Sequence, residues 1–249
     1  MELKGLRILI TGAGSGFGRA MSRHFAQIGA KVIALDINKL TLETLKSENS
    51  GIEIYVCDVS DPLQVEKVVG EIIEKTGGLE VLVNNAGIMK NSPLINILQR
   101  PDRKHSLDLW EKVISINQSS VFYMTRCCAD IMINKRCKGV IINISSISSR
   151  GNIGQTAYSA SKAAVEAMTK VWAKELGRFG IRSVAIAPGF MDTADTAEAI
   201  EEKMLAQWID NTPLKRTGTI QEVVKTVQFA IENDFINGEI ININGGLTI

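Results

Sequence analysis

The chain has 249 residues, of which 45% are hydrophobic and 22% are charged, and its formal net charge is +1. This balance gives no extended positive field that would attract nucleic acid or anionic lipid, so we expect neither as a partner. No apolar run approaches the roughly 20 residues that a membrane-spanning helix needs. The length fits one α/β domain or two small ones.

The cysteines predict free thiols, because their positions form neither a C-x-x-C pair nor a zinc-binding spacing. They are Cys57, Cys127, Cys128 and Cys137. Two histidines, His24 and His105, are too few for a metal site, so no metal is predicted. The first residues lack a signal-peptide pattern, and together with free thiols this leads us to expect a cytoplasmic, reducing location.

A strand, a glycine-rich turn, a helix and a second strand are predicted in order over the first 35 residues, at 7–11, 12–18, 19–28 and 31–35. This order is typical of a dinucleotide-binding unit. The glycines are spaced G-x-x-x-G-x-G, at Gly12, Gly16 and Gly18, with Phe17 where the usual fingerprint has its third glycine. Without Cβ atoms the turn lets the backbone approach a pyrophosphate, which the N-terminus of the following helix attracts.

Asp36, just past the second predicted strand, decides the expected cofactor. Its carboxylate can accept hydrogen bonds from both ribose hydroxyls and would repel the 2′-phosphate of NADP. Ser15 and Ile37 bring no positive charge beside it. We therefore predict NAD, and the alternative is that Asp36 only caps the next helix.

Strands and helices alternate over the rest of the chain. Further strands are predicted at 53–57, 81–83, 140–144, 182–186 and 239–243, and further helices at 62–76, 110–134, 159–176, 196–209 and 220–232. This alternation, with no linker or repeat, predicts one doubly wound α/β domain of Rossmann type over 1–249, with a parallel seven-stranded sheet and helices on both faces. Ligands then lie beyond the carboxyl ends of the strands. At this edge Asp58 could meet the adenine amino group, and Asn85, Ser146 and Gly189 lie there too.

Tyr158 and Lys162 are four residues apart at the start of a predicted helix, so they share a face. An ammonium near a phenol favours the phenolate, and we expect the pKa of Tyr158 to fall from its usual value of about 10. Such a tyrosine can act as a general acid or base on an alcohol oxygen. The alternative is an ordinary amphipathic helix with a buried tyrosine and a solvated lysine.

Together these motifs resemble the short-chain dehydrogenase/reductase family over the whole chain. They are T-G-x-x-x-G-x-G at 11–18, Asp36, Asp58, N-N-A-G at 84–87, Asn117, N-x-S-S at 143–146, Y-x-x-x-K at 158–162 and P-G-x-x-x-T at 188–193. The resemblance implies a nicotinamide cofactor on a one-domain Rossmann fold. The cofactor contacts that it implies are Gly12, Ser15, Gly16, Phe17, Gly18, Asp36, Ile37, Asp58, Val59, Asn85, Ala86, Gly87, Tyr158, Lys162, Pro188, Gly189 and Thr193.

The resemblance also implies catalytic roles for four residues. Tyr158 exchanges a proton with the substrate oxygen, and Lys162 lowers the pKa of Tyr158 and holds the nicotinamide ribose. Ser146 orients the carbonyl or alcohol oxygen. Asn117 disturbs its helix to hold a water that relays protons to Lys162. Hydride passes between the substrate carbon and the cofactor.

The spacing of the serine departs from the family pattern, in which the catalytic serine usually precedes the tyrosine by about 13 residues. Here Ser146 precedes Tyr158 by 12 residues and Ser145 by 13. We prefer Ser146, because strand ends are better fixed than loop lengths, although counting back from Tyr158 points to Ser145. Adjacent strand residues face opposite ways, so only one of the two serines can face the substrate.

Within the family, the segments 88–106, 154–162 and 230–239 resemble the type 2 short-chain 3-hydroxyacyl-CoA dehydrogenases. The resemblance suggests a 3-hydroxyacyl thioester or another lipophilic secondary alcohol, and a 3-oxoacyl or acetoacetyl thioester reductase is the alternative. Basic residues of 88–106 could meet CoA phosphates, or this segment is a solvated loop. A non-catalytic dinucleotide-binding regulator is the alternative of another class. The family further implies a homodimer or homotetramer.

Overall fold

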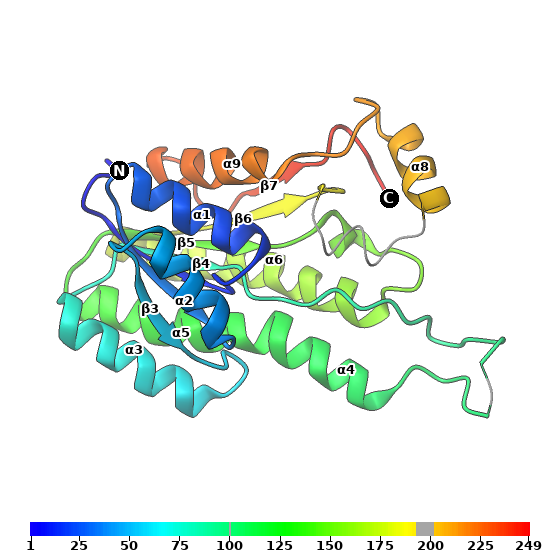
Figure 1. Ribbon diagram of the computed structural model, residues 1–249, viewed down its shortest axis with the longest axis horizontal. Helices are drawn as coiled ribbons and strands as arrows, with labels where there is room; N and C mark the ends of the chain where they lie inside the picture. Colours follow the sequence, from blue (N-terminus) through cyan, green and yellow to red (C-terminus); the bar gives the residue numbers. More distant parts are fainter. Residues whose placement is uncertain (100, 193–201) are drawn as a thin grey trace.

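A seven-stranded parallel sheet, in the order β3-β2-β1-β4-β5-β6-β7, forms the centre of the protein (Figure 1). The computed structural model describes residues 1–99, 101–192 and 202–249. This arrangement confirms the predicted doubly wound α/β fold. The strands are β1 (Arg7–Thr11), β2 (Lys31–Asp36), β3 (Glu53–Val56), β4 (Val81–Asn84), β5 (Gly139–Ile144), β6 (Ile181–Pro188) and β7 (Ile240–Ile243).

Helices cover both faces of the sheet, as a parallel sheet requires (Figure 1). On one face lie α1 (Gly16–Gln27), α2 (Lys39–Glu48) and α9 (Ile220–Glu232). On the other lie α3 (Pro62–Thr76), α5 (Ser120–Asn134) and α6 (Thr156–Leu176), with α4 (Leu107–Ile114) beside α6. The helix α8 (Glu202–Asn211) lies beyond the strand ends, and two short 3₁₀ turns, η2 (Ile147–Arg150) and η3 (Gly177–Phe179), flank α6.

Strand β1 shows how the sheet separates two apolar cores. Ile8 and Ile10 point to one core, where they pack with Phe25 of α1. Leu9, between them, points to the other core, which it shares with Val69 of α3. All five side chains are buried. The burial of both faces explains why the strands read as continuous apolar runs in the sequence.

Two predicted helices need correction, and one helix was not predicted. The unpredicted helix is α2, whose buried face is only Leu42 and Leu45, too few apolar positions for a clear helical period. The predicted helix 110–134 is two α-helices joined by a π-helical turn, η1 (Ser115–Ser119). Of the predicted helix 196–209, the first part lies outside the described residues, and α8 extends to Asn211.

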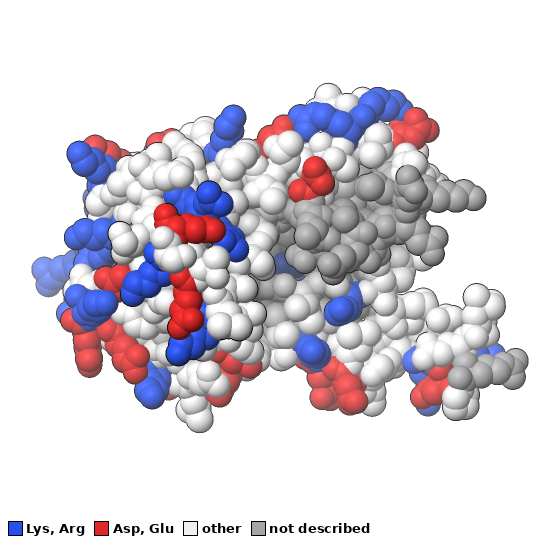
Figure 2. Space-filling view, viewed as in Figure 1, with Lys and Arg blue, Asp and Glu red and all other residues white. Residues whose placement is uncertain are grey.

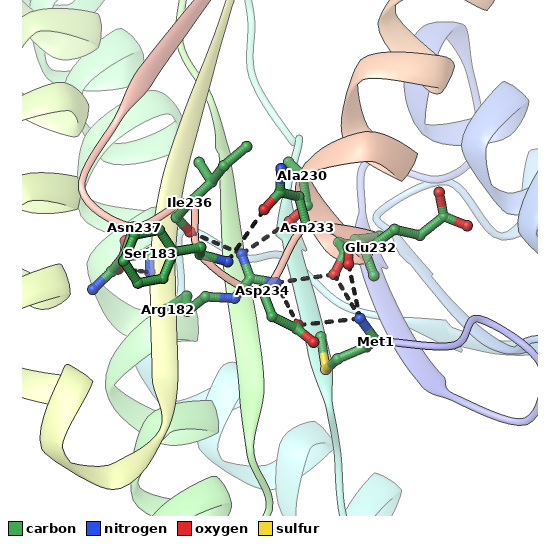
Figure 3. A network of polar contacts seen from close by, with 11 residues as sticks. Met1, Arg182, Ser183, Ala230, Glu232, Asn233, Asp234, Ile236 and Asn237 are labelled. Atoms are coloured by element: carbon green, nitrogen blue, oxygen red, sulfur yellow. Dashed lines mark hydrogen bonds and ion pairs between the residues drawn. The ribbon is translucent and has the colours of Figure 1, made fainter.

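Arg182, in β6, holds the C-terminal end of α9 (Figure 3). Its guanidinium donates hydrogen bonds of 2.9 Å to the carbonyl oxygens of Ala230, Ile231 and Ile236. Burial lowers the pKa of Arg182, and the carboxylate of Asp234, 3.6 Å away, opposes that shift. The last carbonyls of a helix have no partner within the helix and favour a cation. One buried arginine therefore ties this helix to the sheet.

The segment between β4 and α4 extends from the body as an arm (Figure 1). Its two sides pair in antiparallel fashion, since the N–H of Asn96 donates to the Arg103 carbonyl at 2.7 Å and the N–H of His105 to the Leu94 carbonyl at 2.9 Å. Leu94 and Leu98 are exposed on it. Part of the 88–106 segment is thus a paired ribbon.

Charges of both signs are interspersed on the face shown in Figure 2. Over the described parts of the chain, no helix is both long and apolar enough to cross a bilayer. The four cysteines are free thiols.

Candidate active site

The carboxyl ends of the strands border a cavity of about 920 Å³. A volume of this size is at the upper end of the range for ligand pockets. Most residues predicted for the site line this cavity. They are Gly12, Ser15, Gly16, Phe17, Asp36, Ile37, Asp58, Val59, Asn85, Ala86, Gly87, Ser146, Tyr158, Lys162, Pro188 and Gly189.

Two predicted residues lie behind the cavity wall. A Cβ atom on Gly18 would come within 2.1 Å of the Gly12 carbonyl oxygen, so only glycine lets α1 pack against the turn. Asn117 is fully buried, and its side chain accepts from the N–H of Ile88 and donates to its carbonyl, both at 2.8 Å. Thr193 lies outside the described residues.

The glycine turn fits a pyrophosphate. Gly12 and Gly16 have φ of +63° and +48°, a conformation that favours glycine, and the space beside Gly16 is open. The helix α1 begins at Gly16, and its first turn contains no acidic residue. The hydroxyl of Ser15 makes no capping bond. The N–H groups of this helix end therefore face the cavity as donors for an anion.

Asp36 braces the glycine turn, which the sequence analysis did not foresee. Its Oδ2 accepts from the N–H of Gly14 at 2.8 Å, and its Oδ1 accepts from the N–H of Asn38 at 2.9 Å. Asn38, not Asp36, caps α2 with its side chain. Lys39, nearby in the sequence, pairs with Glu43. A carboxylate has about four acceptor sites, so Asp36 retains capacity for ribose hydroxyls.

Three further predicted residues, Asp58, Asn85 and Ala86, are fixed by neighbouring polar groups. Asp58 Oδ1 accepts from the N–H and the hydroxyl of Ser60, at 2.9 and 2.6 Å. The hydroxyl oxygen of Thr11 accepts from the N–H groups of Asn85 and Ala86, both at 3.0 Å. The first residue of the T-G motif thus joins the end of β1 to the N-N-A-G turn.

Tyr158, Ser146 and Lys162 form the polar centre of the cavity. The hydroxyl of Ser146 lies beside the phenol of Tyr158 and accepts from the N–H of Ser148 at 3.1 Å. Lys162 Nζ donates to the Ile144 carbonyl at 2.7 Å and lies 5.8 Å from the centre of the Tyr158 ring. A phenol, a second hydroxyl and an ammonium therefore meet in one part of the cavity.

The hydroxyl of Ser145 is hydrogen-bonded to α6. It donates to Glu166 Oε1 at 2.8 Å, so it is held against the body of α6. The hydroxyl of Ser146, in contrast, is held beside Tyr158. The geometry favours Ser146 as the substrate-orienting serine, and that role stays a prediction.

The expected direction of the Tyr158 pKa is wrong for the protein alone. Burial raises the pKa of Tyr158, and the hydrogen bond from Ser146 opposes this only in part. Burial also lowers the pKa of Lys162, to about 8. Attraction between the two groups alone would lower the pKa of Tyr158, whereas the free-energy cost of burying its charged form raises it.

Asn117 lies within the π-helical turn η1, so the expected disturbance of its helix is present. The water relay that the family resemblance implies stays a prediction. Both polar ends of the Asn117 side chain bind Ile88, which follows Gly87 on the cavity wall.

Other lining residues were not predicted as site residues, although Ser145 was weighed as the alternative to Ser146, and most of them belong to no motif. They are Cys57, Ser60, Ile88, Met89, Lys90, Lys112, Ser115, Ile116, Ile144, Ser145, Ile147, Ser148, Gln155, Phe190 and Met191. Several form an apolar wall, and Phe190 makes an edge-to-face contact with Trp208 of α8. For Ile88, Met89 and Lys90 the signal was the position of the 88–106 segment after a strand end.

The family model described as enoyl-(acyl carrier protein) reductase matches residues 12–248. The chain belongs to the short-chain dehydrogenase/reductase family. It is 41% identical to a 3-oxoacyl-[acyl-carrier-protein] reductase from Thermotoga maritima over the full length of both chains. It is also 33% identical to a (3R)-3-hydroxyacyl-CoA dehydrogenase from Canis lupus familiaris, covering 99% of this chain and 98% of the relative. A gluconate 5-dehydrogenase from Gluconobacter oxydans is 32% identical, over 100% of this chain and 96% of the relative.

Membership of the short-chain dehydrogenase/reductase family makes this chain an oxidoreductase that acts on CH–OH groups with a nicotinamide dinucleotide. The cradle formed by the glycine turn fits that cofactor.

The two serines make a matched test of the site. Ser146→Ala should lower kcat/KM by on the order of 10²-fold, because it removes a hydroxyl beside the reacting oxygen. Ser145→Ala removes the bond to Glu166 and a longer one, of 3.4 Å, to the Lys162 carbonyl, and we expect less than about a fivefold loss. Nicotinamide absorbance during turnover measures both, and a larger loss for Ser145→Ala would reverse the assignment.

Lys162→Met should stabilise the protein alone at pH 7. Between the folded pKa of about 8 and the ordinary value of 10.5, the native state binds fewer protons than the unfolded state, so wild-type stability rises with pH there. Below pH 8 the free-energy cost of burying the charged lysine is fully present. We therefore expect the free energy of unfolding of the variant to exceed that of the wild type by about 2 kcal/mol. Urea unfolding at pH 7 and at pH 9.5 measures this difference, which should be smaller at pH 9.5. Lys46→Met, at an exposed lysine, is the control, and a gain independent of pH would contradict the interpretation.

Proposed function

We propose that this chain is an NAD(H)-dependent oxidoreductase that interconverts 3-hydroxyacyl and 3-oxoacyl thioesters. The observation that supports it best is the meeting of Tyr158, Ser146 and Lys162 in a cavity whose far end carries Asp36. The relatives named for 3-oxoacyl and 3-hydroxyacyl thioesters support the substrate class.

The chemistry at the substrate oxygen follows from two hydroxyls. When bound, the nicotinamide dinucleotide supplies or accepts the hydride. In the reducing direction Tyr158 donates its proton to the carbonyl oxygen, and in the oxidising direction the phenolate accepts the alcohol proton. Ser146 donates a hydrogen bond to the same oxygen and orients it. Lys162 supplies positive charge that favours the phenolate.

The wall of the cavity supports a lipophilic acyl group as substrate. Met89, Ile147, Phe190 and Met191 line it near the strands that carry Ser146 and Gly189. Apolar walls with a few convergent polar groups are the usual composition of small-molecule sites. Both the oxidising and the reducing direction use the same residues, so the reductase alternative shares this site.

Asp36 supports NAD over NADP. The carboxylate lines the cavity at the end of β2, and no ion pair between described residues neutralises it. A 2′-phosphate placed beside it would meet a like charge. Asp58 lines the same end.

We also propose that the protein is cytoplasmic, forms a single domain over 1–249 and assembles as a homodimer or homotetramer through α5 and α6. Phe122 of α5 and Val171 of α6 are large apolar side chains that remain exposed in one chain. An interface between copies would bury them.

Tyr158→Phe should lower turnover of acetoacetyl-CoA with NADH by on the order of 10² or more, because the proton donor is lost. Binding of NADH, followed by protein fluorescence, should change little. Near-normal turnover in the variant would refute the role of the phenol. Wild-type protein that binds NADH but reduces no thioester would favour the non-catalytic regulator.

Asp36→Ala should narrow the preference for NADH over NADPH, expressed as the ratio of their kcat/KM values, by about tenfold or more. Asp58→Ala is the matched control, because it should weaken both cofactors alike. An unchanged ratio for Asp36→Ala, or a wild-type preference for NADPH, would contradict the assignment of NAD.

A further inference from the structure

The charged residues on the cavity wall are divided between its two ends. The carboxylates among the described lining residues are Asp36 and Asp58, which follow β2 and β3. The lysines among them are Lys90, Lys112 and Lys162. Strands β3 and β2 lie on one side of the sheet, whereas β4 and β5, which precede Lys90 and Ser146, lie toward the other. The nucleotide end is acidic and the substrate end is basic.

Lys162 already has a role, since its ammonium is held by the Ile144 carbonyl. Lys90 and Lys112 are different. Among the hydrogen bonds and ion pairs of the described residues, neither ammonium has a partner, and both side chains are exposed on the wall. Two lysines that face one cavity and pair with no carboxylate among the described residues raise the local concentration of an anionic ligand.

Hydrogen bonds fix the backbone beside Lys90 close to the catalytic tyrosine. The side chain of Asn91 accepts from Gln155 Nε2 at 2.9 Å, and the N–H of Ser92 donates to the Gly154 carbonyl at 2.7 Å. These bonds tie the base of the arm to the turn that precedes Tyr158. Lys90 is therefore positioned on the substrate side.

Lys112 lies on α4, whose continuation η1 is bonded through Asn117 to Ile88, two residues before Lys90. It lies three and four residues before Ser115 and Ile116, which also line the cavity. Residues at this spacing share a helix face. Val113, next to Lys112, is fully buried and anchors the helix to the body. Both lysines thus come from elements fixed to the body.

We propose that Lys90 and Lys112 form an anion-binding subsite at the substrate end, so that the substrate carries a carboxylate or a phosphate group together with its apolar part. This inference rests on the proposed function and specifies its substrate class. An ammonium is a strong donor to both oxyanions. The apolar wall and the two cations together fit an amphiphilic substrate.

The test compares three acetoacetyl probes with NADH. Acetoacetyl-CoA carries phosphates, acetoacetate carries a carboxylate, and acetoacetyl-N-acetylcysteamine is a neutral thioester. The variants are Lys90→Met, Lys112→Met and the double variant, with Lys46→Met as the control on α2. All three lysines are exposed, so the substitutions should leave the fold intact, and circular dichroism checks this.

Each single variant should lower kcat/KM for an anionic probe by about threefold to tenfold, and the double variant by on the order of 30-fold. The neutral thioester should change less than about twofold. A selective loss with acetoacetyl-CoA assigns the anion to a phosphate, and a selective loss with acetoacetate assigns it to a carboxylate. Equal losses for neutral and anionic probes, or an effect confined to the KM of NADH, would overturn the subsite.

Failure of the proposed function is distinguishable from failure of the subsite. If wild-type protein reduces none of the probes, the thioester assignment is wrong. Calorimetry then tests whether the two lysines bind an anion. CoA and acetoacetate are titrated into NADH-loaded wild-type protein and into the double variant. Weaker binding of either ligand to the double variant supports the subsite, whereas unchanged or undetectable binding of both overturns it.

Discussion

The buried ammonium of Lys162 is the constraint on which the site depends. The residue is only 5% exposed, and a buried charge is tolerated only with compensating polar partners. The Ile144 carbonyl, 2.7 Å away, is such a partner, and it is the last carbonyl of β5. This bond fixes α6 against the end of the strand. Ser146 follows two residues after that strand, and Tyr158 lies one helical turn before Lys162, so one contact positions all three functional groups.

A second constraint couples the glycine turn to the next strand. Gly14 has no side chain, and a Cβ there would come within 2.2 Å of the Thr41 hydroxyl oxygen and 2.9 Å of Asp36 Oδ2. The N–H of Gly14 can therefore reach the Asp36 carboxylate. The same carboxylate that we assign to ribose recognition also holds the turn in shape. Substitution of Asp36 consequently acts on the nucleotide directly and also through the cradle.

The strands and the residues at their ends were predictable, because apolar runs and motif spacing are local properties of the chain. Other features depend on tertiary contacts. The choice between Ser145 and Ser146 needed the position of Glu166, which lies 21 residues after Ser145 on α6. The direction of the pKa shift of Tyr158 could be predicted only with knowledge of its burial. Lys112 belongs to no motif, and only the packing of α4 brings it to the cavity wall.

The pKa shifts of Tyr158 and Lys162 also determine which protonation states the two groups have at a given pH. With its pKa raised by burial, Tyr158 is protonated at neutral pH, and this is the form that donates a proton to a carbonyl oxygen. Oxidation requires the phenolate, which needs positive charge close by. Lys162 can supply that charge only below its own pKa of about 8. A rise in pH therefore has two opposite effects on the phenolate. It favours loss of the Tyr158 proton, but it also deprotonates the Lys162 ammonium, whose charge stabilises the phenolate. In the protein alone at neutral pH, Tyr158 is therefore in the protonated form that a proton donor requires.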